Sequence, residues 1–349
     1  ALGAIAVPLD YWWTAKDAFA ALDQAQPKIL IVGKAQAANL VALKAEIEAA
    51  GIQHVISVEE TPPGDFLAYE RVLAQAEPLA EPAAVAQADP ALILFTSGST
   101  GRSKGAVHTH GDLGATALII NLEVGVRRGE RTLQFLPMYS SCLEHMIPYT
   151  LAHATHVIMP QFDAAGVWEM IARHGVTHFN AVPTTLRRIL DRMPDRVPDS
   201  LRLVSYASEP MPAGLITELM ERLPNIDFVQ IYGMIEHLCV TVQGAAEQKR
   251  KIGTVGHPMI GAELRILGAD GTPSDDGAQG EIVARSPTLF AGYWRDPDAT
   301  AQVVKNGWMR TGDIGYFDED GFLVLSGRLK EVIKSGGVTV IPNEVEGML

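Results

Sequence analysis

The sequence predicts an α/β protein made of two α/β subdomains followed by a small β-rich subdomain. Up to about residue 250, short apolar runs alternate with amphipathic stretches, the pattern of successive βαβ units on a largely parallel sheet. Beyond about residue 253, the pattern changes to short strands separated by Gly- and Asp-containing turns. With 349 residues the chain is long enough for two or three units that each bury a core.

The first part of the chain contains predicted helices at 14–24 and 37–50 and predicted strands at 28–32 and 54–58. Thr14 can cap the first helix, and Gly51 ends the second. Both strands are short apolar runs. The stretch 61–89, rich in Pro, Ala and acidic residues, reads as a surface connection with one helix.

The middle and last parts continue the alternation. Helices are expected at 111–121, 164–174, 184–193 and 213–223, and strands at 131–136, 156–159, 177–182, 201–206 and 227–232. The β-rich part is expected to hold strands at 262–267 and 280–284. A further strand pair, 315–317 and 322–325, flanks the turn 318–321.

Composition narrows the class of protein. The formal net charge is −13 and there is no long basic run, which argues against a general nucleic-acid or anionic-membrane surface. Cys142 and Cys239 cannot form a disulfide framework and lack metal-site spacing, so a cytoplasmic, reducing location is the default expectation. No apolar run approaches the roughly 18 residues of a membrane span.

Both ends of the sequence fall within patterned segments. Residues 1–8 begin without Met inside an apolar stretch, and 345–349 stop where an amphipathic segment begins. The expectation is the interior of a longer protein.

The stretch 91–105 is the strongest candidate for chemistry. Five apolar residues that suit a buried strand are followed by ten residues of hydroxyls, glycines and two cations. Glycines let backbone N–H groups form an anion-binding concavity, and Lys104 adds a mobile positive charge. The spacing of Gly98, Gly101 and Lys104 does not match a Walker A loop. A phosphate-binding loop is the favoured interpretation, and a solvated Gly/Ser loop is the alternative.

Three further stretches carry weaker signals. The stretch 230–237 ends a predicted strand with Tyr232 and Glu236, at the place where open α/β sheets bind ligands. In the functional interpretation, Tyr232 could stack on a base and Glu236 could hold Mg²⁺. In the alternative, Tyr232 is a core residue and Glu236 a surface residue beside it. The stretch 207–212 is an adenine-edge loop or a proline-marked turn. The stretch 308–313 ends in a carboxylate suited to ribose hydroxyls, or is a local Gly-Asp turn.

Other residues give little signal. The stretch 326–337 is a linker, or it brings an Arg to a nucleotide. The histidines lack metal-ligand spacing with acidic neighbours. No Gly-x-Ser-x-Gly elbow supports a serine hydrolase.

Taken together and in order, these stretches resemble the adenylate-forming superfamily of acyl-CoA synthetases, peptide-synthetase adenylation domains and luciferases. The resemblance covers essentially the whole chain and rests on five motifs, at 95–105, 232–236, 280–293, 308–313 and 327–346. It implies an N-terminal domain of two αβα subdomains plus a small β-barrel-like subdomain, with the C-terminal domain largely absent. The implied divisions are 1–122 with the phosphate loop, 123–252, 253–325, and 326–349 as hinge and start of the missing domain.

The resemblance also implies roles for individual residues. It assigns the ATP phosphates to Thr96, Ser97, Gly98, Ser99, Thr100, Gly101 and Lys104, and the adenine or AMP to Ser208, Glu209, Pro210, Tyr232, Gly233 and Ile235. It assigns Mg²⁺ to Glu236, the ribose to Asp313 and Arg328, the hinge to Lys330, and the acyl pocket to Tyr139, Ser140 and Ala207. No catalytic residue is expected in this chain, because the family's catalytic lysine belongs to the C-terminal domain.

The implied function is activation of a small-molecule carboxylate by ATP to an acyl-adenylate, followed by thioester formation with CoA, as in fatty acid metabolism. The hinge sequence 330–337 with 341–344 favours such a ligase over a peptide-synthetase domain that loads a carrier protein. ATP, Mg²⁺ and CoA are the implied small molecules, and a homodimer is compatible with the family. The chain alone is expected to be poorly active.

Three residues depart from the family pattern. Ile235 replaces the usual Thr, whose hydroxyl contacts the α-phosphate, and such a loss costs roughly 1–3 kcal/mol if its partner stays buried. Ser103 replaces a Pro of the loop, a milder change, and Ser140 stands where many members carry His or another large residue. These departures keep open a second alternative, a catalytically impaired nucleotide- or acyl-binding relative.

Overall fold

The computed structural model describes residues 2–96, 103–274, 277–331, 333–335 and 338–340, without the side chains of 140–142 and of the last two segments. The chain forms two compact units. The first unit comprises Ala1–Gly111 and Ala291–Pro297, and the second comprises Asp112–Phe290 and Asp298–Leu349. Within the described residues, none of the helices is both long enough and apolar enough to span a membrane.

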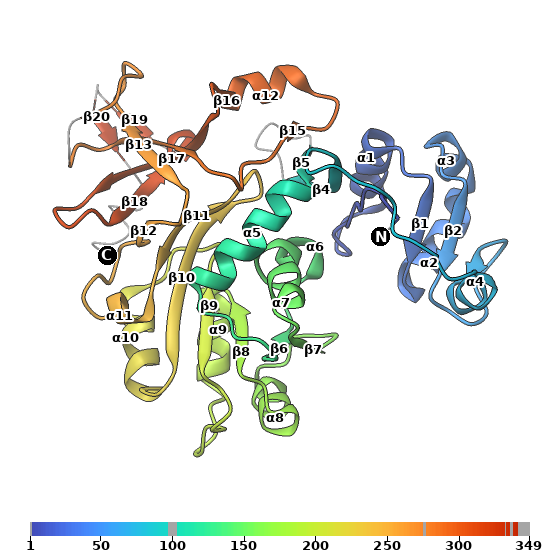
Figure 1. Ribbon diagram of the computed structural model, residues 1–349, viewed down its shortest axis with the longest axis horizontal. Coiled ribbons are helices and arrows are strands. Elements are labelled where there is room, and N and C mark those ends of the chain that lie inside the picture. Colours follow the sequence, from blue (N-terminus) through green and yellow to red (C-terminus); the bar gives the residue numbers. More distant parts are fainter. Residues whose placement is uncertain (1, 97–102, 275–276, 332, 336–337, 341–349) are drawn as a thin grey trace. The chain divides into compact units, whose positions relative to one another are not determined.

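The first unit holds two small sheets (Figure 1). One is parallel, in the order β1-β2-β3, and the other is antiparallel, in the order β15-β5-β4. Its elements are α1 (Ala15–Ala25), β1 (Ile29–Val32), α2 (Lys34–Leu40), the 3₁₀ turn η1 (Val41–Leu43), α3 (Lys44–Ala49), β2 (His54–Ser57), β3 (Leu67–Ala68), α4 (Tyr69–Gln75), β4 (Pro90–Thr96), β5 (Lys104–Thr109) and β15 (Gly292–Tyr293).

Local sequence explains the limits of α1. The Thr14 hydroxyl accepts a hydrogen bond from the Asp17 N–H at 3.3 Å, as an N-cap does. The helix ends at Gln26, whose φ of 50° lies in the left-handed region. Ala21 and Leu22 are on the buried side, as expected from the pattern.

The second unit is built on a seven-stranded sheet in the order β12-β11-β10-β9-β8-β6-β7. Its strands from β10 to β7 are parallel to their neighbours, and β11 and β12 are antiparallel. In Figure 1, α5 passes in front of this sheet. The elements are α5 (His110–Glu123, which begins in the first unit), β6 (Arg131–Gln134), α6 (Met138–Ser141), the π-helix η2 (Cys142–Met146), α7 (Ile147–Leu151), β7 (Thr155–Ile158), α8 (Ala164–His174), β8 (His178–Ala181), α9 (Pro183–Leu190), β9 (Leu203–Tyr206), α10 (Ala213–Arg222), β10 (Asp227–Met234), β11 (His237–Gln243), α11 (Ala245–Gln248) and β12 (His257–Pro258).

The two faces of the seven-stranded sheet differ in chemistry. One face packs against α8, α9 and α10 through an apolar core that includes Trp168, Phe179 and Phe228. Because side chains alternate along a strand, the strand neighbours of Phe179 and Phe228 point to the other face. There β8 and β9 present polar groups, among them His178 and Ser205, both buried.

The β-rich part of the second unit forms a sheet in the order β13-β14-β17-β16, with β18 paired to β17. The predicted turn 318–321 joins β17 and β18, and the Asp318 carboxylate accepts hydrogen bonds from the N–H groups of Asp320 and Phe322 at 3.0 and 2.9 Å. The elements are β13 (Glu263–Leu267), β14 (Gly280–Arg285), α12 (Pro297–Val303), β16 (Val304–Lys305), β17 (Trp308–Phe317), β18 (Leu323–Arg328), the 3₁₀ turn η3 (Leu329–Glu331), β19 (Ile333–Ser335) and β20 (Val338–Val340), the last two forming a separate pair.

One local expectation is wrong. The helix expected at 37–50 is divided into α2, η1 and α3, because Leu43 has left the helical region with φ −113° and ψ 27°. Strand β5 (Lys104–Thr109) was not among the predicted elements. The alternation of helices and strands and the overall α/β class are confirmed.

Candidate functional site

Three predicted site residues of the second unit lie in direct contact. The Tyr232 hydroxyl on β10 donates a hydrogen bond to Oδ2 of Asp313 on β17, at 2.7 Å. The guanidinium Nε of Arg328 lies 3.1 Å from the other oxygen, Oδ1. Residues 313 and 328 face each other in the β17–β18 register, so the backbone fixes this ion pair. Tyr232, Asp313 and Arg328 are called the tyrosine–aspartate cluster below.

Burial dominates the electrostatics of this cluster. It raises the pKa of the Asp313 carboxyl, while the Tyr232 hydrogen bond and the Arg328 charge lower it. Burial, and then the Asp313 charge, also raise the pKa of Tyr232, which keeps the phenol protonated as the donor. The Asp313 side chain is 9% exposed. The cluster therefore holds a carboxylate in a poorly hydrated place, where an incoming hydrogen-bond donor gains more than it would in water.

Asp313 retains capacity for a ligand. Each carboxylate oxygen has two lone pairs, and one on each oxygen is taken by Tyr232 or Arg328. Among the contacts of the described residues, two lone pairs therefore remain for a pair of hydroxyl groups. The Thr311 hydroxyl orients the backbone here, because it accepts from the Asp313 N–H at 3.0 Å and donates to the Ile282 carbonyl at 2.8 Å.

The turn between β10 and β11 carries Ile235 and Glu236, both partly buried. Gly233 is required where the strand register shifts, since a Cβ there would lie 2.9 Å from the Cys239 nitrogen. The turn is tied down by the Phe290 N–H, which donates to the Glu236 carbonyl at 3.0 Å. A single carboxylate fits Mg²⁺, which usually takes one or two protein carboxylates beside phosphate and water. The described residues contain no group of three metal-ligating side chains.

The loop after β9 contains the predicted adenine residues. Ser208 adopts a left-handed backbone with φ 74°, and Pro210 is exposed. The Glu209 carboxylate accepts from the Thr184 N–H at 3.3 Å and lies 3.4 Å from the Thr184 hydroxyl. Because Thr184 is at the start of α9, where N–H groups lack helical partners, this contact fixes the loop to the next element.

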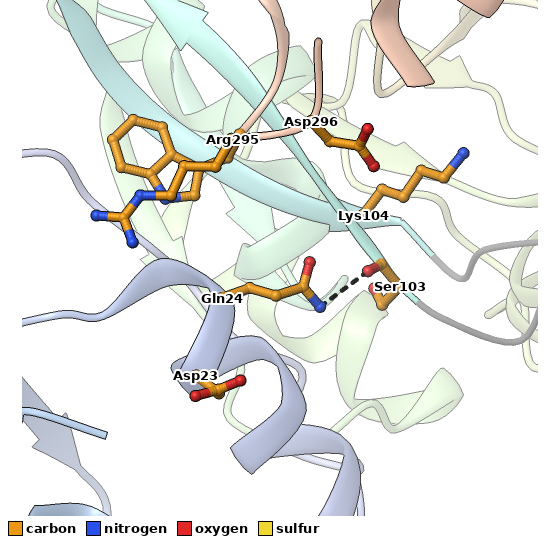
Figure 2. Close-up of a pocket in the computed structure, with 7 residues that line it drawn as sticks. Asp23, Gln24, Ser103, Lys104, Arg295 and Asp296 are labelled. Carbon is orange, nitrogen blue, oxygen red and sulfur yellow. Dashed lines mark hydrogen bonds between the residues drawn. The ribbon is translucent and has the colours of Figure 1, made fainter. Parts of the chain in front are cut away.

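In the first unit, the two ends of the predicted phosphate loop lie on paired strands. Thr96 ends β4 and Lys104 begins β5, and the two are register partners. The Ser103 hydroxyl donates to the Thr96 carbonyl across this pair. The Gln24 amide of α1 donates to the Ser103 carbonyl at 3.2 Å, as the dashed line in Figure 2 shows. The predicted phosphate residues Ser97, Gly98, Ser99, Thr100 and Gly101 lie outside the described residues.

A cavity of about 410 Å³ adjoins this strand pair. It is lined by Asp23, Gln24, Ser103, Lys104, Trp294, Arg295 and Asp296, all from the first unit. Figure 2 labels the charged and polar residues among them. The Lys104 ammonium is 5.1 Å from the centre of the Tyr293 ring, a cation–π distance. The backbone N–H of Trp294 donates to the Gly105 carbonyl at 2.7 Å. Lys104 therefore emerges from a well-anchored strand.

The remaining predicted residues are placed on separate elements. Tyr139 and Ser140 are on α6, and the side chain of Ser140 is outside the described part. Ala207 is buried one residue beyond β9, and Lys330 lies in η3, two residues after Arg328.

The structure therefore joins Tyr232, Asp313 and Arg328 directly, while Thr96 and Lys104 belong to the other unit. Nothing in the sequence indicated a role for Gln24. Thr311 lies within the stretch 308–313 and Thr184 at the start of the predicted helix 184–193, but their contacts with the backbone and with Glu209 were not predicted.

Comparison with known proteins decides the family. The model of the AMP-binding enzyme family matches residues 1–294. The chain belongs to the AMP-binding enzyme family. It is 34% identical to the long-chain-fatty-acid–CoA ligase FadD13 of Mycobacterium tuberculosis over 354 residues, 100% of this chain and 68% of that protein. It is 36% identical to the sulfoacetate–CoA ligase of Cupriavidus necator, over 74% of this chain and 52% of that protein.

A solved structure extends the likeness to three dimensions. The O-succinylbenzoate coenzyme A synthetase of Bacillus subtilis, in complex with ATP and magnesium ion, matches with a TM-score of 0.85 and 28% identity. The match covers 98% of this chain and 68% of the other. The chain thus spans from about half to about two thirds of the length of these relatives. The expected superfamily and fold are confirmed.

Proposed function

We propose that the protein activates a carboxylic acid with ATP and transfers the acyl group to CoA. The tyrosine–aspartate cluster is the observation that carries this proposal. Within the described part of the chain, its buried carboxylate keeps one lone pair on each oxygen for two ribose hydroxyls, and it occurs in a member of the AMP-binding enzyme family. Relatives that are named CoA ligases support CoA as the acceptor.

In the first half-reaction, a carboxylate oxygen of the acid attacks the α-phosphorus of ATP. The bond from the α-phosphorus to the bridging oxygen breaks, and pyrophosphate leaves. Lys104 offers its positive charge to the phosphates, and Asp313 holds the ribose in position, so that catalysis rests on charge neutralisation and alignment. Mg²⁺, when bound at Glu236, would neutralise phosphate charge.

In the second half-reaction, the CoA sulfur attacks the acyl carbon of the adenylate. The bond from the acyl carbon to the phosphate oxygen breaks, AMP leaves, and the thiol proton passes to solvent or a base. Lys330 would mark the hinge for the change between the two steps. Ser208, Glu209 and Pro210 would face the adenine, with the loop held by the Glu209–Thr184 contact.

The test is carboxylate-dependent exchange of labelled pyrophosphate into ATP, measured with the natural full-length protein and a panel of carboxylic acids. Exchange with at least one acid, followed by thioester formation with CoA, supports the proposal. Thioester formation only with a carrier protein would favour a peptide-synthetase-type domain. A failure of every acid to support exchange would reject both.

The second candidate is a catalytically impaired relative that binds nucleotide, which Ile235 and Ser140 motivate. Under this alternative, calorimetry detects ATP binding while exchange stays at background. Restoration of exchange by Ile235→Thr would identify the missing hydroxyl as the defect.

A further inference from the structure

The polar face of the seven-stranded sheet is covered in part by the π-helix η2. A π-helical turn is rare and occurs often at functional sites. This one carries Glu144, which points to Asn180 on β8: the Asn180 amide Nδ2 donates to the Glu144 carboxylate at 3.2 Å. In the strand register Asn180 is the partner of Ser205 on β9.

A chain of hydrogen bonds fixes the orientation of Asn180. The Ser205 hydroxyl donates its proton to the Asn180 carbonyl oxygen at 3.2 Å. Ser205 must then accept from His178, whose Nε2 lies 2.9 Å away. His178 therefore carries its proton on Nε2, which also lies 3.2 Å from the Tyr149 hydroxyl. With the Ser205 hydroxyl donating to its carbonyl oxygen, the Asn180 amide presents its NH₂ group to Glu144.

Glu144 itself is left under-compensated. Among the described residues, it receives one hydrogen bond from a neutral amide, and no cation forms an ion pair with it. Burial is the main cause that raises the pKa of its carboxyl. The residue is nevertheless partly exposed. The carboxyl group itself is poorly hydrated, and a carboxylate there gains from a further hydrogen-bond donor.

The position of Glu144 relates it to the proposed acyl site. Ser205 lies in β9, and the predicted acyl residue Ala207 and adenine residue Ser208 follow along the same chain direction. With a rise of about 3.3 Å per residue, Ser205 and its partner Asn180 lie roughly 3 Å before Tyr206, where β9 ends. An extended acyl group that starts near the strand end and runs back along this face would approach the Glu144 carboxylate, which contacts Asn180.

We propose that Glu144, oriented by Asn180, is a specificity-determining residue that accepts a hydrogen bond from a hydroxyl or ammonium group on the far end of the acyl substrate. The protein would then activate carboxylic acids with a polar end in preference to plain alkyl acids. The inference rests on the proposed acyl-activating function and deepens it. A site built to pair a polar group discriminates strongly against an analogue that lacks it, because its own polar atoms stay unpaired.

The experiment compares hexanoate, 6-hydroxyhexanoate and 6-aminohexanoate in the exchange assay with the natural full-length protein. The expected kcat/KM for a polar-ended acid exceeds that for hexanoate by at least about tenfold. In Glu144→Leu this ratio falls by at least about tenfold while the KM for ATP stays the same. Glu144→Gln keeps the preference for the hydroxyl acid and loses any preference for the ammonium acid. Glu169→Leu, on the exposed side of α8, is the matched control with unchanged ratios.

The outcomes separate the inference from the function on which it rests. Equal kcat/KM values for the three acids in the wild type, or an unchanged ratio in Glu144→Leu, would overturn the role of Glu144. Absence of exchange with any acid would instead reject the proposed function. In that case, the affinities of the wild type and of Glu144→Gln for the same three acids are measured by calorimetry. Tighter binding of hexanoate than of the polar-ended acids, or equal affinities of the two proteins, would overturn the role of Glu144.

Discussion

Removal of one hydroxyl, in Tyr232→Phe, is the sharpest test of the tyrosine–aspartate cluster. The hydroxyl donates to a buried carboxylate at 2.7 Å, and a hydrogen bond to a charged group contributes about 1.5–3 kcal/mol. We expect the free energy of unfolding to fall by about that amount at pH 7, measured by urea denaturation. Tyr206→Phe is the control, because the buried Tyr206 hydroxyl lies 3.1 and 3.0 Å from the neutral amide oxygens of Gln230 and Gln248. Its expected cost is about 0.5–1.5 kcal/mol.

The dependence on pH makes this test specific. The folded-state pKa of Asp313 is raised above 3.8, and the Tyr232 hydrogen bond lowers it, so the substitution raises it further. A carboxyl with a raised folded pKa loses stability as pH rises through that pKa. The cost of Tyr232→Phe is therefore largest above the folded pKa and shrinks as pH falls towards 3.8, whereas the cost of Tyr206→Phe is flat. Equal costs for both substitutions, or a Tyr232→Phe cost that grows in acid, would refute the reasoning.

Three further substitutions test other parts of the structure. Gly256→Ala should destabilise the protein by about 2–5 kcal/mol in thermal unfolding, because φ is +89° and the new Cβ would lie 1.8 Å from the Val242 carbonyl oxygen. Its control is Gly214→Ala in α10, where the new Cβ meets no atom within 4 Å, and this variant should be more stable by about 0.5–1 kcal/mol. Similar effects of the two substitutions on stability would contradict this prediction. Ser103→Ala should weaken ATP binding by about 2- to 10-fold in calorimetry, because the hydrogen bond that restrains the loop end against the Thr96 carbonyl is lost. Ser103→Pro loses the same bond but restrains the backbone by its ring, so it should bind ATP normally, and an unaffected Ser103→Ala would remove this role. Ile235→Thr should raise the exchange rate by about 5- to 150-fold, equivalent to about 1–3 kcal/mol, and no gain would show that the hydroxyl is not limiting.

Much of the fold was predictable because its signals are local. The strands at 28–32 and 227–232 are short apolar runs, and α1 begins at a capping hydroxyl and ends where predicted. The break in the helix at 41–43 was not predictable, because no Gly or Pro marks it. Strand β5 was missed because 104–109 has little strand propensity and is held by pairing with β4 and β15, contacts that only the folded chain provides.

The site was predictable as a set of residue types, and its connections were not. Tyr232 and Asp313 are 81 positions apart, and nothing in either motif indicates that the phenol binds the carboxylate. The same holds for Gln24, which reaches Ser103 over 79 positions. Glu144 gave no signal at all, since its importance comes from burial beside a single neutral amide. Partners that meet through tertiary packing leave no local pattern.

The central claim is that the acid attacks the α-phosphorus of ATP, and an oxygen-labelling measurement tests it most directly. The natural full-length protein is supplied with ATP, CoA and a carboxylic acid that carries ¹⁸O in both carboxyl oxygens, and the products are analysed by mass spectrometry. The account predicts that one ¹⁸O atom per turnover appears in AMP, because the attacking oxygen stays on the phosphorus when the thioester forms. Label in inorganic phosphate together with ADP would show attack at the γ-phosphorus and contradict the account.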